Sequence, residues 1–211
     1  MKVIKELILE IVKYLNIYSE SNPEKEIISK LKAVSLNERN DASHISTSFL
    51  KAEALRESLA SIEESSLIAI KNCILNSFSE LNWKIDDGQF YDIKSGVGDS
   101  YLKGNMHTEL IGPKTGYFSF GDLRLGLFFL ESNTFYPDHK HEAPELYVNL
   151  TNSTKWRFDR KDWKELQPGS IVYNEPYRIH AIHVQKIPFL SVWCWPRNSS
   201  KKCTVVPTKK N

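Results

Sequence analysis

The sequence predicts an α+β protein, mainly β, in which an N-terminal helical cap covers a C-terminal antiparallel barrel. In residues 1–82, apolar side chains recur at the spacing of one helix face. From Trp83 onward glycine and proline become frequent, and short aromatic and β-branched runs lie between turn signals. We therefore expect a helical segment over residues 1–82, a barrel over 83–200 and a tail over 201–211.

Two helices are expected before the first polar stretch. The first carries an apolar stripe formed by Val3, Ile4, Leu7, Ile8, Ile11, Val12 and Leu15. Asn22 suits an N-cap, and Pro23 suits the first position of a second helix that continues to about Val34.

A polar stretch and a longer helical pattern complete this half of the chain. Residues 36–48 are rich in charged and amide side chains, which predicts a loop and places its His44 at the surface. Apolar residues again recur at helical spacing from about Phe49 to Leu81, with a break near Ser61.

The second half is predicted to consist of short strands. They cover residues 90–94, 107–111, 124–131, 133–139, 145–150, 155–158, 170–173, 178–184 and 189–195. Turn signals such as Gly112-Pro113 and Pro168-Gly169 separate them. Many short strands at regular spacing predict a sandwich or a barrel.

Composition excludes several classes of function. The chain has 211 residues, 41% hydrophobic and 26% charged, which suits one soluble domain with a buried core. A formal net charge of +2 gives no strong attraction for nucleic acid or an anionic membrane. The sequence contains no G-x-G-x-x-G or P-loop pattern, so nucleotide binding has no support.

The cysteines and the N-terminal residues predict a reducing, cytoplasmic setting. Cys73, Cys194 and Cys203 are odd in number and form no C-x-x-C pair, which argues against a disulfide framework. Residues 1–15 mix lysine and glutamate with apolar residues, unlike a signal peptide or a membrane span.

The chemistry-bearing residues concentrate in one stretch. His139, His141, Glu145 and Tyr147 all carry odd numbers, and residues two apart on a strand share a face. A further imidazole downstream would complete a set of three histidines and one carboxylate. Such a set suits one divalent transition metal, namely Zn²⁺, Fe²⁺, Mn²⁺ or Ni²⁺.

The downstream ligand has two candidates from position alone. His180 and His183 differ by three, so on a regular strand only one of them faces inward. His107 could also reach the interior, although a hydrogen-bonded strand histidine is its plainer interpretation.

Aromatic residues provide the remaining candidates. Tyr147 shares the ligand face, and a nearby cation lowers the pKa of a phenol, so Tyr147 is a candidate base. Tyr136 lies three residues before His139, where Pro137 disturbs the pleat and removes parity as a guide. Trp156 and Trp193 lie on predicted strands and could face a positively charged ligand group.

The segment from about Gly121 to Pro196 resembles the cupin family, and within it the cupin lyases that cleave dimethylsulfoniopropionate (DMSP). The matching residues are Tyr136, Pro137, His139, His141, Ala143, Glu145, Tyr147, Trp156 and His180-Ala181. The second cupin motif matches Pro168-Gly169 followed by His180, which favours His180 over His183 as the ligand. The usual glycine before the tryptophan is replaced by Thr151-Asn152-Ser153, where Asn152 could supply a positive φ.

The resemblance implies a cupin barrel, a double-stranded β-helix of jelly-roll type, and β-elimination of a small zwitterionic substrate to dimethyl sulfide and acrylate. The implied metal ligands are His139, His141, Glu145 and His180. Tyr147 would be the base, and Tyr136 would orient the substrate or tune the metal. Trp156 and Trp193 would face the dimethylsulfonium group.

Two other functions stay open at this point. One is a different metal-dependent cupin enzyme, such as a dioxygenase or isomerase, and the other is a non-catalytic cupin that binds a metal or small ligand. Members of the family are often dimers, and the apolar stripe of the first helix would offer a surface for a homodimer.

Overall fold

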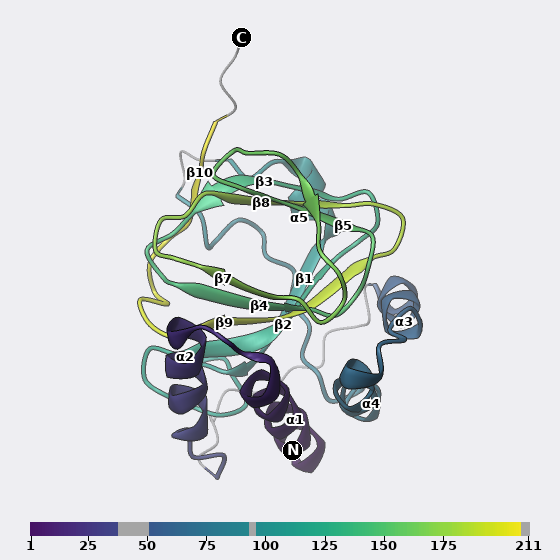
Figure 1. The fold of residues 1–211 in the computed structure, drawn as a ribbon, viewed down its shortest axis with the longest axis vertical. Coiled ribbons are helices and arrows are strands. Elements are labelled where there is room, and N and C mark those ends of the chain that lie inside the picture. Colours follow the sequence, from purple (N-terminus) through teal and green to yellow (C-terminus); the bar gives the residue numbers. More distant parts are fainter. Residues whose placement is uncertain (38–50, 93–95, 208–211) are drawn as a thin grey trace.

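The computed structural model describes residues 1–37, 51–92 and 96–207, and consists of two facing β-sheets with the helices of the N-terminal half on one side (Figure 1). The first sheet has the order β1 (Asn105–Ile111), β2 (Arg124–Leu130), β9 (Phe189–Trp195), β4 (Glu145–Asn149) and β7 (Ile171–Asn174). The second has the order β10 (Thr204–Val205), β3 (Phe135–Lys140), β8 (His180–Val184), β5 (Thr154–Phe158) and β6 (Lys164–Glu165). Neighbouring strands pair antiparallel in both sheets, as the cupin fold requires.

Eight of the nine predicted strands correspond to strands of the structure. The strand predicted at 90–94 is wrong within the described residues, where Tyr91 makes only a single bridge to Cys203. The helix α5 (Asp99–Gly104) and the strands β6 and β10 were not predicted. Strand β10 shows that the expected tail joins the second sheet, since Val205 pairs with His139 of β3.

The N-terminal half forms α1 (Lys2–Tyr18), α2 (Asn22–Lys32), α3 (Ala52–Ala60), a 3₁₀ turn (Ser65–Leu67) and α4 (Ile68–Asn76). The last three confirm the predicted break near Ser61. The N-cap of α2 is Ser21 and not Asn22: its hydroxyl accepts from the Glu24 amide, and the Glu24 carboxylate accepts from the Ser21 amide. The expected surface position of His44 lies outside the described residues.

The helices pack on the face of the first sheet that points away from the second sheet (Figure 1). Buried residues of α1 and of the sheet form one cluster, which we call the helix–sheet layer. It includes Ile4, Leu7, Ile11 and Leu15 of α1 with Leu125, Leu127, Phe129, Leu146, Val148 and Leu190 of the sheet. The apolar stripe of α1 is therefore mostly buried within the chain, with Val3 and Val12 partly buried, and the expected homodimer stays a prediction.

The opposite face of the first sheet meets the second sheet in the barrel interior. Phe128 and Leu130 of β2 belong to this second cluster, together with Tyr136, Tyr147, Trp156, Ile182 and Phe189. Strand β2 is thus buried on both faces, with odd-numbered residues toward the helices and even-numbered residues toward the interior.

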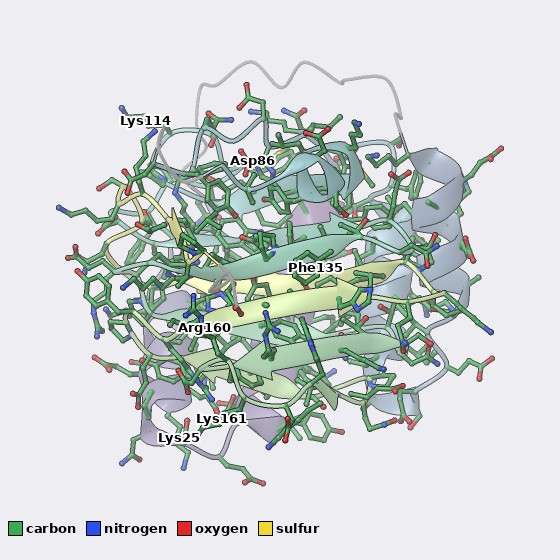
Figure 2. The ribbon with its side chains drawn as sticks, turned by 90° about the horizontal axis from the view of Figure 1, so that it is seen from above. Lys25, Asp86, Lys114, Phe135, Arg160 and Lys161 are labelled. Atoms are coloured by element: carbon green, nitrogen blue, oxygen red, sulfur yellow. The ribbon has the colours of Figure 1, made fainter. Side chains whose placement is uncertain are left out.

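Among the described residues no helix covers the outer face of the second sheet, where Phe135 is 39% exposed (Figure 2). The turn between β4 and β5 reaches its positive φ of 60° at Ser153 and not at Asn152. Within the described ranges, no helix combines the length and apolar character needed to cross a bilayer.

Candidate active site

Three imidazoles meet inside the barrel beside the second sheet. His139 on β3 pairs across the strands with His180 on β8, and His141 follows in the turn after β3. One ring nitrogen from each lies within 4.8 Å of the other two. All three side chains are buried, with at most 3% of each residue exposed.

Each ring is oriented by a backbone carbonyl. The Nδ1 atoms lie 2.7–2.9 Å from a carbonyl oxygen two residues away, which is Pro137 for His139, Ala143 for His141 and Arg178 for His180. Because a carbonyl oxygen only accepts, Nδ1 carries the hydrogen, and in the neutral imidazole Nε2 then keeps its lone pair. This arrangement turns three lone pairs toward one point, as in metal-binding histidines.

Glu145, the first residue of β4, completes the cluster. Its Oε2 lies 3.2 Å from Nε2 of His141 and 3.2 Å from Nε2 of His180. Its Oε1 accepts a hydrogen bond of 2.7 Å from Nε1 of Trp195. Burial by itself raises the pKa of the Glu145 carboxyl, but the neighbouring imidazoles outweigh it and hold that pKa well below its usual value.

The cluster fits a divalent metal ion. Nε2 of His180 is fully buried, yet it has no hydrogen bond within the described chain despite its nearness to Glu145. Burial also holds the pKa of His139 well below 6.5, which favours the neutral imidazole that a metal needs. Three imidazoles and one carboxylate are a donor set for a borderline divalent ion.

A cavity of about 60 Å³ opens beside this cluster. By the same measure a single water needs about 10–15 Å³, so the cavity has room for a small molecule. It is lined by Asp86, Phe90, Tyr91, Tyr101, His107, Phe128, Tyr136, Glu145, Tyr147, Trp193, Trp195 and Cys203. The wall is mostly aromatic, with polar atoms at a few points.

Tyr147 and Trp193 both line this cavity, because they pair directly across β4 and β9. Tyr147 follows Glu145 on the same face of β4, so its phenol lies on the ligand side as parity predicted. Trp156 lies elsewhere than expected: it is fully buried, packs against the Tyr147 ring at 5.1 Å and is not part of the cavity lining.

Tyr136 lies directly beside one of the three clustered histidines. Its ring stacks on that of His139, with centroids 4.0 Å apart and planes at 17°. The pairing of β3 with β8 shifts register between Tyr136 and His139, which brings the two rings together despite their odd spacing. The Tyr136 hydroxyl contacts the hydroxyl of Tyr91.

The other two histidines of the described residues lie apart from the three clustered histidines. His183 is exposed on the outer face of the second sheet, where its ring meets those of Phe135 and Trp163 at 6.0 Å each. His107 lines the cavity near Phe90, and burial lowers its pKa to about 4. It is therefore neutral at physiological pH.

Several wall residues were not assigned to the site from the sequence. Trp195 shares a face with Trp193, two residues earlier, and this spacing marks it as a neighbour of that predicted residue. Asp86, Tyr91, Tyr101 and Cys203 come from connecting segments and a short helix, which carry no local pattern that points to the cavity.

The family model described as dimethylsulfoniopropionate (DMSP) lyase matches residues 22–191. The chain belongs to the DMSP lyase family. The match begins in α2, so the family unit includes helices that the sequence had suggested were an appended cap.

One relative and two solved structures are similar to this chain. The chain is 23% identical over 142 residues to the dimethylsulfoniopropionate lyase DddQ of Ruegeria pomeroyi, covering 67% of this chain and 68% of that protein. A crystal structure of DddQ from the same organism shares the fold with a TM-score of 0.71, at 16% identity over 100% of this chain and 99% of the other. A structure from a study of the DMSP lyases RdDddP and RnDddQII matches with a TM-score of 0.69, at 13% identity over 98% of both chains.

Proposed function

We propose that this protein is a metal-dependent carbon–sulfur lyase that cleaves DMSP to dimethyl sulfide and acrylate by β-elimination. The observation that carries the proposal is the convergence of three histidines and Glu145 beside a cavity that Tyr147 lines. Membership of the DMSP lyase family makes DMSP the first substrate to test.

Four side chains would hold one divalent ion, which we take to be Zn²⁺, Fe²⁺, Mn²⁺ or Ni²⁺. They are His139, His141, Glu145 and His180. When bound, such an ion supplies Lewis acidity that makes the hydrogen next to a substrate carboxylate more acidic. The Trp195 hydrogen bond holds one oxygen of Glu145, and this leaves the other oxygen turned toward the imidazoles.

Tyr147 would be the base. Burial and then the Glu145 carboxylate hold the pKa of its phenol well above 10, so it needs positive charge nearby to act at neutral pH. Its oxygen would take a proton from the carbon next to the substrate carboxylate. The released electron pair forms the C=C bond of acrylate, the C–S bond breaks, and dimethyl sulfide leaves as a neutral molecule.

Other wall residues would bind and orient the substrate. Tyr136, stacked on His139, would position the substrate near the ligands, and the Trp193 ring would face the sulfonium group. Trp156 does not line the cavity and would instead hold the ring of Tyr147 in position by packing against it.

The test is incubation of the purified protein, loaded in turn with each of the four metals, with DMSP. Dimethyl sulfide measured by gas chromatography and acrylate measured by liquid chromatography should appear in equal amounts. Oxygen uptake with Fe²⁺ and no acrylate would identify a dioxygenase instead. Tight DMSP binding with no product would identify a non-catalytic cupin. Either result overturns the proposal.

A further inference from the structure

A second carboxylate lies in the wall of the cavity, away from the metal-ligand cluster. Asp86 belongs to the segment that precedes the barrel strands and is 2% exposed. It lies next to α5 (Figure 2), where its Oδ2 accepts a hydrogen bond of 2.9 Å from the Tyr101 hydroxyl. Its Oδ1 accepts a bond of 2.9 Å from the amide of Gly88.

The position of Asp86 is fixed by its backbone. Its amide donates to Oδ1 of Asn105 at 2.8 Å, and Nδ2 of Asn105 donates back to the Asp86 carbonyl at 2.9 Å. The same Nδ2 lies 2.9 Å from the carbonyl of Tyr101. Asn105 thus ties the Asp86 segment, α5 and β1 together, and the carboxylate is held in place before any ligand arrives.

The charge of Asp86 has no positive partner. Within the part of the chain that the structure describes, Asp86 forms no ion pair, and no lysine or arginine lines the cavity. The other carboxylate in the wall, Glu145, already faces two imidazoles. Burying a carboxylate without a cation is unfavourable, and burial raises the pKa of Asp86. A cationic ligand group would compensate it.

A row of rings connects the two carboxylates. Tyr136 stacks on His139 at 4.0 Å, and Tyr101 stacks on the other side of the row against Tyr136 at 4.3 Å. The hydroxyl of Tyr101 then contacts Asp86. The metal-ligand cluster and Asp86 therefore lie at the two ends of one short aromatic wall. This wall suits a molecule with a carboxylate at one end and a cation at the other.

We propose that Asp86 is the counter-charge for the cationic end of the substrate, and that it gives the site its preference for onium carboxylates over isosteric carboxylates that lack the cation. The identity of the substrate in this inference rests on the proposed function. The preference for a cation rests only on the residues of the cavity wall.

Two matched ligands test it by binding, without turnover. 3-(Trimethylammonio)propanoate and 4,4-dimethylpentanoate have the same shape, but only the first carries a cation. Calorimetry on the full chain loaded with Zn²⁺ should show that the wild type binds the onium carboxylate about tenfold or more tightly than the isostere that lacks the cation. D86N should lose most of that preference and keep its affinity for the isostere without the cation. D87N removes an exposed charge from the next residue and should bind both ligands like the wild type.

Three results overturn the inference: equal affinities in the wild type, an unchanged preference in D86N, or an equal loss for both ligands in a folded D86N. The wild-type comparison decides alone if D86N does not fold. A preference for the cation without release of dimethyl sulfide from DMSP would overturn the proposed function but keep this inference. Release of dimethyl sulfide from DMSP without a preference for the cation would keep the proposed function but overturn this inference.

Discussion

The two hydrophobic regions on either side of the first sheet differ in composition. The helix–sheet layer is built mainly of isoleucine, leucine and valine, whereas the barrel interior is built mainly of aromatic residues, several with hydroxyl groups. The buried histidines, Glu145 and Asp86 all adjoin the second region. The aliphatic layer can stabilise the sheet without polar groups, while the interior holds polar groups that need partners or a ligand.

Strand β4 shows how close these two roles lie. Leu146 and Val148 point into the helix–sheet layer, and Glu145 and Tyr147 point into the barrel interior. Alternation along a strand therefore separates stability from chemistry at neighbouring residues. Substitutions on one face should change the free energy of unfolding, and substitutions on the other should change metal binding or turnover.

The largest expected effect comes from removing a metal ligand. His180→Ala should lose the bound ion, and its turnover of DMSP should fall to background, because Nε2 of His180 is one of four converging donors. Metal content by atomic emission and dimethyl sulfide release measure the two effects. Ile11→Ala, in the helix–sheet layer, should lower the free energy of unfolding by about 2–5 kcal/mol and keep both. A His180→Ala protein that keeps its ion would exclude this residue as a ligand.

Adjacent residues of β4 give the sharpest contrast. Tyr147→Phe should retain the ion and lower kcat about 10²–10⁴-fold, since only the proposed base is removed. Val148→Ala should leave kcat unchanged and lower the free energy of unfolding by about 2 kcal/mol. Steady-state kinetics and urea denaturation of both variants measure these effects. Full activity in Tyr147→Phe would remove Tyr147 from the base role.

The strands could be predicted because their signals are local. Alternating faces and turn residues placed eight strands, and parity alone put His139 and Glu145 with Tyr147 on the inner wall. Parity could not choose between His180 and His183. The packing does, since His180 is buried against His139 while His183 meets Phe135 on the outer face.

The rest of the cavity wall depends on contacts between distant segments. The aromatic run at Phe90-Tyr91 has strand propensity, but its backbone bonds reach Cys203 far along the chain, and it forms a connecting segment instead. Asn105 brings Asp86 and Tyr101 together by hydrogen bonds to both backbones. Neither the helical nor the strand repeat of the sequence predicts this contact. His139, His141 and Glu145 were thus predictable from spacing, whereas the choice of His180 and the groups opposite this cluster were not.

A smaller effect is expected from Trp195, which positions Glu145. Trp195→Phe keeps an aromatic ring beside His141 but removes the donor to Oε1 of Glu145, so metal affinity should fall about 10–100-fold. Trp193→Phe is the matched control, because within the described residues the Nε1 of Trp193 has no hydrogen bond. It should raise KM for DMSP and leave metal affinity unchanged. Competition with a chelating dye measures both affinities, and equal affinities for the two variants would contradict the positioning role.

The smallest expected effect lies farthest from the chemistry, at the start of α2. Ser21→Ala removes the hydroxyl that accepts from the Glu24 amide, and it should lower the free energy of unfolding by about 1 kcal/mol. Ser29→Ala, exposed in the middle of the same helix, should be neutral or slightly stabilising, because alanine favours the helix there. Neither should change kcat or metal affinity if the helix–sheet layer only supports the sheet from outside. A loss of turnover in Ser21→Ala would mean that α2 and the barrel interior are coupled through the first sheet, and that its two faces are not independent.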